Sequence, residues 1–142
     1  MTGVTLQMVS DATAALAARS LTTVRADMAA DFEAAGGALP RGPKWLLSDG
    51  DRILGLGGLE PRGAAASAGW LLVGEGLTAR DWAAGRWAIR LALHFARSRC
   101  VWRIGVLVDP DKAAPRAFLA GMGFVAAEPE EDGLMMVLEL IQ

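Results

Sequence analysis

A short stretch in the second half of the chain combines a helix start with small and basic residues, a combination suited to binding phosphate. Thr78 precedes Asp81 by three residues, as an N-cap residue precedes its reciprocal partner at the start of a helix. Such a start presents free backbone N–H groups and the positive end of the helix dipole to an anion. Small residues let a diphosphate approach the backbone, and arginines add charge-assisted hydrogen bonds. The residues predicted to bind the diphosphate are Arg80, Ala83, Ala84, Gly85 and Arg86. The alternative is a solvated helix start with two exposed arginines.

The hydrophobic pattern predicts the elements that must position this helix. Residues 69–73 (G-W-L-L-V) form a continuous apolar run, which is typical of a central strand buried on both faces. The helix after it spans residues 78–97 and is the longest in the chain. Residues 44–47 and 52–59 predict a hairpin, because the Asp49-Gly50 pair between them is a favoured turn.

The remaining elements complete a single α/β domain. Strands are expected at residues 4–9, 101–108, from 123 and 134–140, and helices at residues 11–19, 22–35 and 113–122. The resulting order is β-α-α-β-β-β-α-β-α-β-β. Residues 61–67 are expected to be a small-residue connection, and residues 128–133 an acidic turn. The glycines at 55–58 are not followed by a helix, so they predict close approach of another backbone or a ligand rather than a phosphate loop.

The composition narrows the function. The 142 residues suffice for one core, and the formal net charge of -2 comes with basic residues spread along the chain. We therefore expect no nucleic-acid partner. The single cysteine, Cys100, and the single histidine, His94, give no support to a disulfide framework or a metal site. No run approaches the roughly 18–20 apolar residues of a membrane span, and the first residues do not resemble an export signal, so we expect a cytoplasmic protein.

The order of elements and two motifs resemble the GNAT superfamily of N-acetyltransferases over nearly the whole chain. The family's diphosphate motif reads Arg/Gln-x-x-Gly-x-Gly/Ala at the start of this helix, and residues 80–85 (R-D-W-A-A-G) match its first and last positions. Residues 112–124 (K-A-A-P-R-A-F-L-A-G-M-G-F) are similar to the family's last helix and the Gly-Phe after it. The resemblance implies a mixed central sheet of about six or seven strands with helices on both faces.

Three departures from the family pattern fall at functional positions. Ala83 replaces the first glycine, Lys112 stands where an asparagine is common, and Leu119 stands where the family often has its tyrosine acid. The chain has no tyrosine at all. A narrower likeness, to GNAT-like proteins of tailed phages, rests on residues 69–73, on the Arg and Trp residues of the long helix, on Val108-Asp109, and on residues 25–27 (R-A-D) with Glu33. Some members of that group are assigned to the virion, which implies a use of the fold other than catalysis.

The resemblance implies acetyl-CoA as cosubstrate, attacked directly by an amine. The pantetheine arm would lie along residues 69–73, and a backbone N–H near Leu72 or Val73 would stabilise the oxyanion. The amine must first lose a proton, because an alkylammonium has a pKa near ~10.4. The expected proton acceptor is Glu60, then Glu75, then Asp109, each of which is otherwise a solvated carboxylate. Without a tyrosine acid a slow reaction remains feasible, because a thiol of pKa near ~8.5 leaves as thiolate without full protonation.

Two functions from different classes therefore remain open. The first is an acetyl-CoA-dependent N-acyltransferase that acts on a small-molecule or protein amine. The second is a binding protein, virion-associated for example, that keeps the fold without the reaction. Trp82 lies inside the predicted diphosphate site and would shield an adenine, close the site or join a protein interface. A homodimer is compatible with either function.

Overall fold

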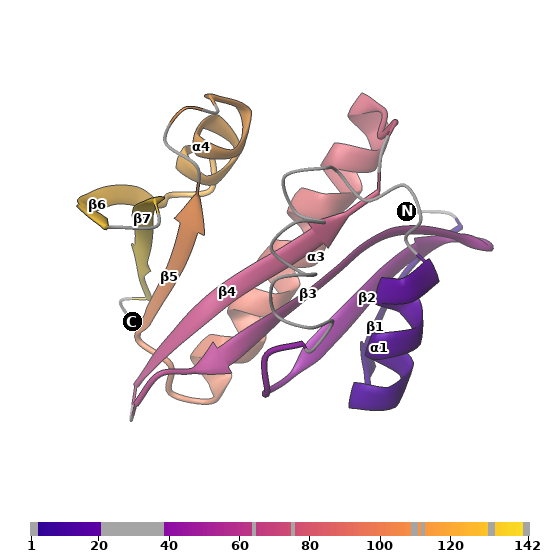
Figure 1. The fold of residues 1–142 in the computed structure, drawn as a ribbon, viewed down its shortest axis with the longest axis horizontal. Coiled ribbons are helices and arrows are strands. Elements are labelled where there is room, and N and C mark those ends of the chain that lie inside the picture. Colours follow the sequence, from indigo (N-terminus) through magenta and orange to yellow (C-terminus); the bar gives the residue numbers. More distant parts are fainter. Residues whose placement is uncertain are drawn as a thin grey trace.

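The computed structural model is a seven-stranded sheet with helices on both of its faces (Figure 1). It describes residues 3–20, 39–63, 65–74, 76–108, 111, 113–130 and 133–140. The strands are β1 (Val4–Val9), β2 (Lys44–Asp49), β3 (Arg52–Pro61), β4 (Ala66–Val73), β5 (Arg103–Val108), β6 (Val125–Glu130) and β7 (Gly133–Glu139). The described helices are α1 (Asp11–Ser20), α3 (Ala79–Ser98) and α4 (Ala113–Ala120).

The sheet has the spatial order β1-β2-β3-β4-β5-β7-β6. Strands β4 and β5 pair in parallel, and every other neighbouring pair is antiparallel. The mixed sheet that the sequence predicts is therefore confirmed. The described elements follow the order β-α-β-β-β-α-β-α-β-β, which differs from the expected order by one helix. That helix, expected at residues 22–35, lies outside the described residues.

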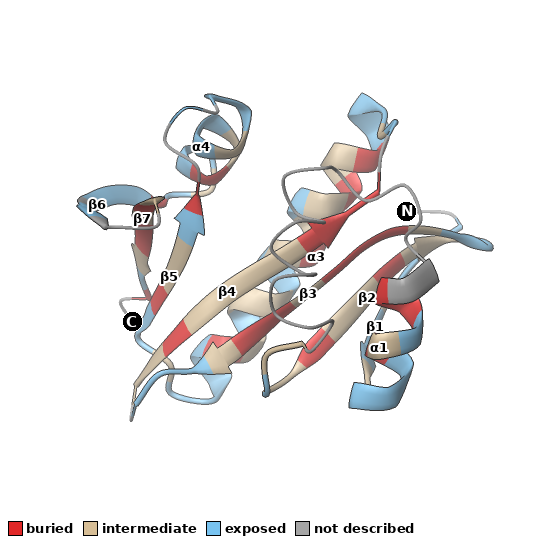
Figure 2. Ribbon diagram, in the orientation of Figure 1, coloured by how far each residue is buried: buried red, intermediate tan, exposed pale blue. Residues whose placement is uncertain are grey.

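Different helices cover the two faces of the sheet. Leu56 of β3 packs with Ala14 of α1 on one face, and Leu54 packs with Ala84 of α3 on the other. In a regular strand these two leucines would share a face. The pairing with β2 shifts by one residue next to Leu47. The resulting bulge lets Leu54 and Leu56 face opposite sides of the sheet, where both are buried (buried residues are red in Figure 2).

A third core cluster attaches α4 to the rest of the molecule. It joins the second half of α3 to β5, β7 and α4, and its buried members are Leu59, Ala96, Ile104, Val108, Leu119, Phe124, Leu134, Met136 and Leu140. Leu119, which stands where the related family often has a tyrosine, is one of these buried residues. Its side chain therefore serves packing, and a polar side chain at this place would need a hydrogen-bond partner.

Several expected boundaries are wrong. β4 begins at Ala66, so Ser67 is a buried strand residue rather than part of a connection. β5 begins at Arg103 rather than at residue 101. β6 continues to Glu130, so part of the expected acidic turn is strand. The residues that open β4 are small and have low strand propensity, so pairing with β3 and β5 decides their conformation.

The glycines of β3 admit the neighbouring strand closely, as their spacing predicts. A Cβ added at Gly57 would lie 3.0 Å from the carbonyl oxygen of Trp70. A Cβ added at Gly58 would lie 2.7 Å from Nε1 of the same tryptophan. The backbone and indole ring of β4, rather than a ligand, therefore occupy the space beside these glycines.

We expect Gly58→Ala to lower the free energy of unfolding by about 1–3 kcal/mol, because the added methyl overlaps the Trp70 ring. Denaturant unfolding followed by circular dichroism measures this loss. Gly74→Ala is the matched control, because the nearest atom to its added Cβ is 3.5 Å away. The control should change the free energy of unfolding by no more than about 0.5 kcal/mol. Equal losses in the two variants would contradict this packing account.

Candidate functional site

Strands β4 and β5 pair over four residues and then separate. Their last pair is Gly69 with Val106, whereas β4 continues to Val73 and stays paired with β3. Within the described part of the chain, residues 70–73 have no partner strand on the β5 side, and we call this stretch the β4 edge. Alternate residues of the edge direct their N–H and C=O groups to that side. Leu72 and Val73 are buried, and buried backbone groups are rarely left without a partner, so the edge favours a bound ligand.

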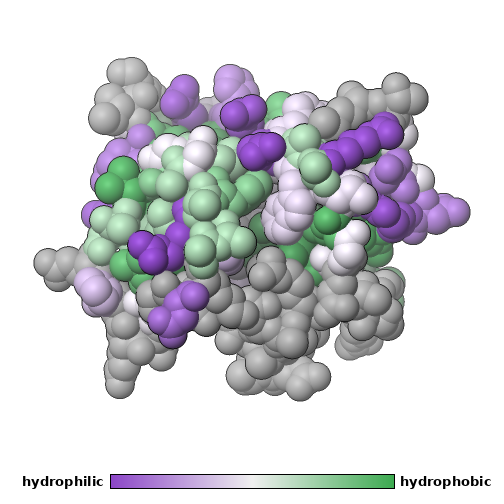
Figure 3. Space-filling model, turned by 90° about the horizontal axis from the view of Figure 1, so that it is seen from above, coloured by the Kyte–Doolittle hydropathy of each residue, from purple (hydrophilic) through white to green (hydrophobic). Residues whose placement is uncertain are grey.

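The helices on either side of this edge touch through two aromatic rings. α3 begins beyond the end of β4, and α4 follows β5 (Figure 1). The rings of Trp82 in α3 and Phe118 in α4 lie 5.4 Å apart between centroids, at an interplanar angle of 61°. Viewed from this end, the surface over α4 is largely hydrophobic (Figure 3). Of the roles expected for Trp82, the contact favours closure of the site.

Gly85 leaves open space on the side of α3 that carries Trp82. It follows Trp82 by three residues, which places it about 60° around the helix axis. No atom lies within 4 Å of a Cβ added there. A glycine inside a helix costs about 0.5–1 kcal/mol relative to alanine, and no neighbour in the described residues requires it. The open space therefore favours a role for Gly85 in binding.

The start of α3 is capped by its own side chains. The Thr78 hydroxyl accepts a hydrogen bond from the Asp81 N–H at 3.2 Å, and the Asp81 carboxylate accepts one from the Thr78 N–H at 2.9 Å. This confirms the capping box that the sequence predicts. Arg52, the first residue of β3, forms an ion pair with the same carboxylate, which is 6% exposed. The Thr78 N–H lowers the pKa of Asp81 most, burial opposes this, and Arg52 lowers it further, so the carboxylate is charged at neutral pH.

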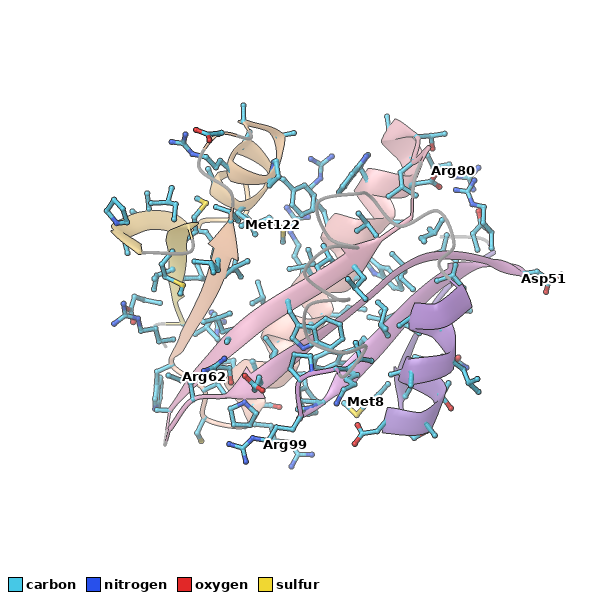
Figure 4. The ribbon with its side chains drawn as sticks, in the orientation of Figure 1. Met8, Asp51, Arg62, Arg80, Arg99 and Met122 are labelled. Carbon is cyan, nitrogen blue, oxygen red and sulfur yellow. The ribbon has the colours of Figure 1, made fainter. Side chains whose placement is uncertain are left out.

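The residues predicted to bind a diphosphate do not gather at one place. Arg80 lies about 160° around the helix from Trp82, and Figure 4 shows it on the side of α3 away from α4. Ala84 is 1% exposed and packs against β2 and β3. Ala83 lies about 100° from Trp82, and the exposed Arg86 about 40° from it. Only Gly85 and Arg86 of the five therefore share the side of α3 that carries Trp82.

Glu60, the first predicted proton acceptor, lies toward the other end of β4. It pairs with Ala68, four residues before Leu72, which is roughly 13 Å along the strand. Its carboxylate is 22% exposed and forms a 2.6 Å ion pair with Arg62. Figure 4 shows Arg62 far from Arg80, at the opposite end of the sheet. The structure thus places Leu72 and Val73 in the β4 edge, whereas Glu60 lies outside it, next to the part of β4 that pairs with β5.

Two of the expected proton acceptors lie outside the residues that the structure describes. Glu75 and Asp109 are not among the described residues, so their roles stay predictions. Among the residues that are described, no group of three or more His, Cys, Asp or Glu side chains is arranged to hold a metal ion. No described helix has the length and apolar character needed to cross a membrane.

Comparison with solved structures identifies the fold. The ribosomal-protein-S18-alanine N-acetyltransferase of Escherichia coli matches with a TM-score of 0.74 and 14% identity, over 98% of this chain and 95% of that one. The YncA protein of Salmonella typhimurium, solved with its cofactor acetyl-CoA, matches with a TM-score of 0.70 and 13% identity, over 99% and 96%. The ribosomal-protein-alanine N-acetyltransferase of Brucella melitensis gives 0.65 and 15%, over 96% and 99%. The chain has the GNAT N-acetyltransferase fold.

At these identities the GNAT likeness establishes the fold alone. No protein-family profile and no curated protein matches the sequence. The narrower likeness to phage proteins finds no support in these three structures, so it stays a prediction.

Two residues that shape this part of the GNAT fold were not predicted from the sequence pattern. Arg52 reaches Asp81 across 29 positions, and Phe118 reaches Trp82 from a separate helix. The signal for Arg52 is indirect: a buried aspartate at a helix start needs a compensating cation. Phe118 gives no signal beyond its apolar character, because the sequence does not show that α4 approaches α3.

Asp81→Asn should lower stability at neutral pH by about 1–3 kcal/mol, because it removes a buried charge-assisted hydrogen bond. The folded pKa of Asp81 lies below its unfolded value of about 3.9, so its contribution is complete above that pH and disappears as the pH falls through the folded pKa. Urea unfolding at several pH values should therefore show the gap to wild type closing below about pH 4. A gap that persists unchanged at acidic pH would contradict this assignment.

Proposed function

We propose that the chain is an N-acyltransferase that takes an acetyl group from acetyl-CoA and passes it to an amine. The observation that carries the proposal is the β4 edge, a strand segment without a partner strand on the β5 side beyond Gly69, in which Leu72 and Val73 are buried. The open space at Gly85 supports it from the side of α3. The GNAT fold, and the acetyl-CoA with which the Salmonella protein was solved, favour the same donor.

The β4 edge suits the pantetheine arm of this donor. The arm carries two amide groups, whose N–H and C=O groups are able to pair with a strand edge as an added strand would. Arg86, exposed on the side of α3 that carries Trp82, is placed to contact a phosphate beyond the arm. Bound in this way, acetyl-CoA supplies an activated acyl thioester.

The transfer begins with a neutral amine. Its lone pair attacks the thioester carbonyl carbon, a C–N bond forms, and the C–S bond breaks with its electron pair leaving on sulfur. The amine gives up one proton to a carboxylate or to water, and the thiolate leaves the site. A backbone N–H of the β4 edge, with Leu72 and Val73 as the predicted donors, stabilises the negative charge that develops on the carbonyl oxygen.

Glu60 is the proposed proton acceptor; because it lies roughly 13 Å along the strand from Leu72, the proton would reach it through intervening water. Leu72 is buried beneath α1, whereas Ala68 and Trp70 on the same face are only partly buried. An amine that approaches from this face therefore meets the sheet beside Glu60, which is paired with Ala68. Arg62 orients the Glu60 carboxylate through their ion pair.

A non-catalytic binding function is the second candidate, and the start of α3 favours it. Asp81 occupies the helix start, and the Trp82–Phe118 contact bridges α3 and α4 next to the β4 edge. With this function the chain would keep the GNAT scaffold and bind proteins, including virion components or a second copy of itself, without turning over a thioester.

Calorimetric titration with acetyl-CoA tests the first function, with Gly85→Ala as the informative variant. Wild type should bind, and the variant should bind at least about tenfold more weakly, a loss of about 1.4 kcal/mol, because its methyl fills the open space. The same change should raise the free energy of unfolding by about 0.5–1 kcal/mol, so weaker binding will not reflect unfolding. Absence of binding to wild type would leave the non-catalytic function.

Glu60→Gln should lower kcat for the best substrate in a panel of amines by about 10²–10⁴-fold, since the amide does not accept the proton. Release of the free thiol reports the rate, and calorimetry should show unchanged acetyl-CoA affinity. Glu139→Gln is the matched control, because Glu139 also pairs with an arginine, Arg103, on a neighbouring strand. Equal activity of wild type and Glu60→Gln would assign the base elsewhere.

A further inference from the structure

The start of α3 already holds an anion. The Asp81 carboxylate is 6% exposed, accepts the Thr78 N–H at 2.9 Å and pairs with Arg52. A helix start attracts a diphosphate through free N–H groups and a positive local field. Here the side chains of Thr78 and Asp81 take two of those N–H groups, and the Asp81 charge opposes the field. A diphosphate at this place would have to displace a carboxylate that already binds Arg52 and the Thr78 N–H.

Other groups of α3 near this place are also occupied or directed elsewhere. The Trp82 N–H donates to the Thr78 carbonyl oxygen at 3.0 Å inside the helix, so it is not free for a ligand. Its indole ring lies against Phe118. Arg80 points away from α4 (Figure 4), so of the two predicted arginines Arg86 is the one on the side of α3 that carries Trp82.

The features that suit the pantetheine arm are, by contrast, intact. The β4 edge leaves backbone N–H and C=O groups without a partner strand, and nothing lies within 4 Å of a Cβ added at Gly85. Hydrogen bonds along a strand edge recognise amide groups, and their strength does not depend on a phosphate elsewhere in the ligand. The chain thus offers a free surface to the pantetheine arm, whereas its own side chains occupy the place where the diphosphate would bind.

We propose that this chain recognises its acyl donor by the pantetheine arm and gains little affinity from the nucleotide diphosphate. Its donor class is then the acyl thioesters of pantetheine, with or without the nucleotide. This inference rests on the proposed acyltransferase function and narrows its substrate.

Calorimetric titrations of the full chain with acetyl-CoA and with S-acetyl-pantetheine test the inference. We expect the two dissociation constants to agree within about threefold. Adenosine 3′,5′-bisphosphate, which lacks the arm, should not displace bound acetyl-CoA. If acetyl-CoA binds more than about tenfold tighter than S-acetyl-pantetheine, the inference is overturned while the acyltransferase function stands. If neither thioester binds, the function and the inference fall together.

The variant Asp81→Asn tests whether the Asp81 carboxylate is the group that disfavours the diphosphate. Removal of the charge should strengthen acetyl-CoA binding about tenfold or more and leave S-acetyl-pantetheine binding unchanged, because only the former carries a diphosphate. Glu139→Gln is the matched control: Glu139 is exposed on β7 and pairs with Arg103 at the first residue of β5, and its loss changes the net charge equally. We expect this control to change neither affinity. A similar effect of both variants, or none from Asp81→Asn, would overturn the assignment to Asp81.

Discussion

The separation of β4 from β5 is the constraint on which the rest of this structure depends. At the last pair the strands approach so closely that a Cβ on Gly69 would lie 3.1 Å from Cγ2 of Val106. Beyond it β4 keeps β3 as its neighbour, and β5 keeps β7. Each strand retains one ladder of hydrogen bonds, so the sheet holds together while a stretch of buried backbone is left unpaired.

In the helix that follows this edge, one feature stabilises the helix and disfavours anion binding, and another destabilises the helix and favours ligand binding. The capping box of Thr78 and Asp81 stabilises the start of α3 by about 1 kcal/mol, and it places a negative charge where an anion would otherwise bind. Gly85 does the reverse, because it gives up about 0.5–1 kcal/mol of helix stability and keeps space open. Asp81 and Gly85 are four positions apart. Together they explain how one helix leaves a surface free for the amide-bearing arm and disfavours a diphosphate.

Most of the fold was predictable from local sequence patterns. The site was only partly predictable, because it depends on contacts between segments that are distant in the sequence. Alternation and turn residues predicted the β2–β3 hairpin, and the Thr78–Asp81 spacing predicted the start of α3. The direction of Arg80 depends on which face of α3 meets the sheet, which a motif match alone does not specify. The pairing of Arg52 with Asp81 depends on where the hairpin ends in space. The early start of β4 at Ala66 depends on pairing with strands on both sides.

Backbone amide chemical shifts during a titration with acetyl-CoA test the central claim most directly. If the donor's arm pairs with the β4 edge, the largest changes should fall on residues 70–73 and on Gly85, while the Arg80 amide, on the far side of α3, should change little. Saturable binding that leaves residues 70–73 unperturbed would contradict the account, because the unpaired edge would then not be the surface that holds the ligand.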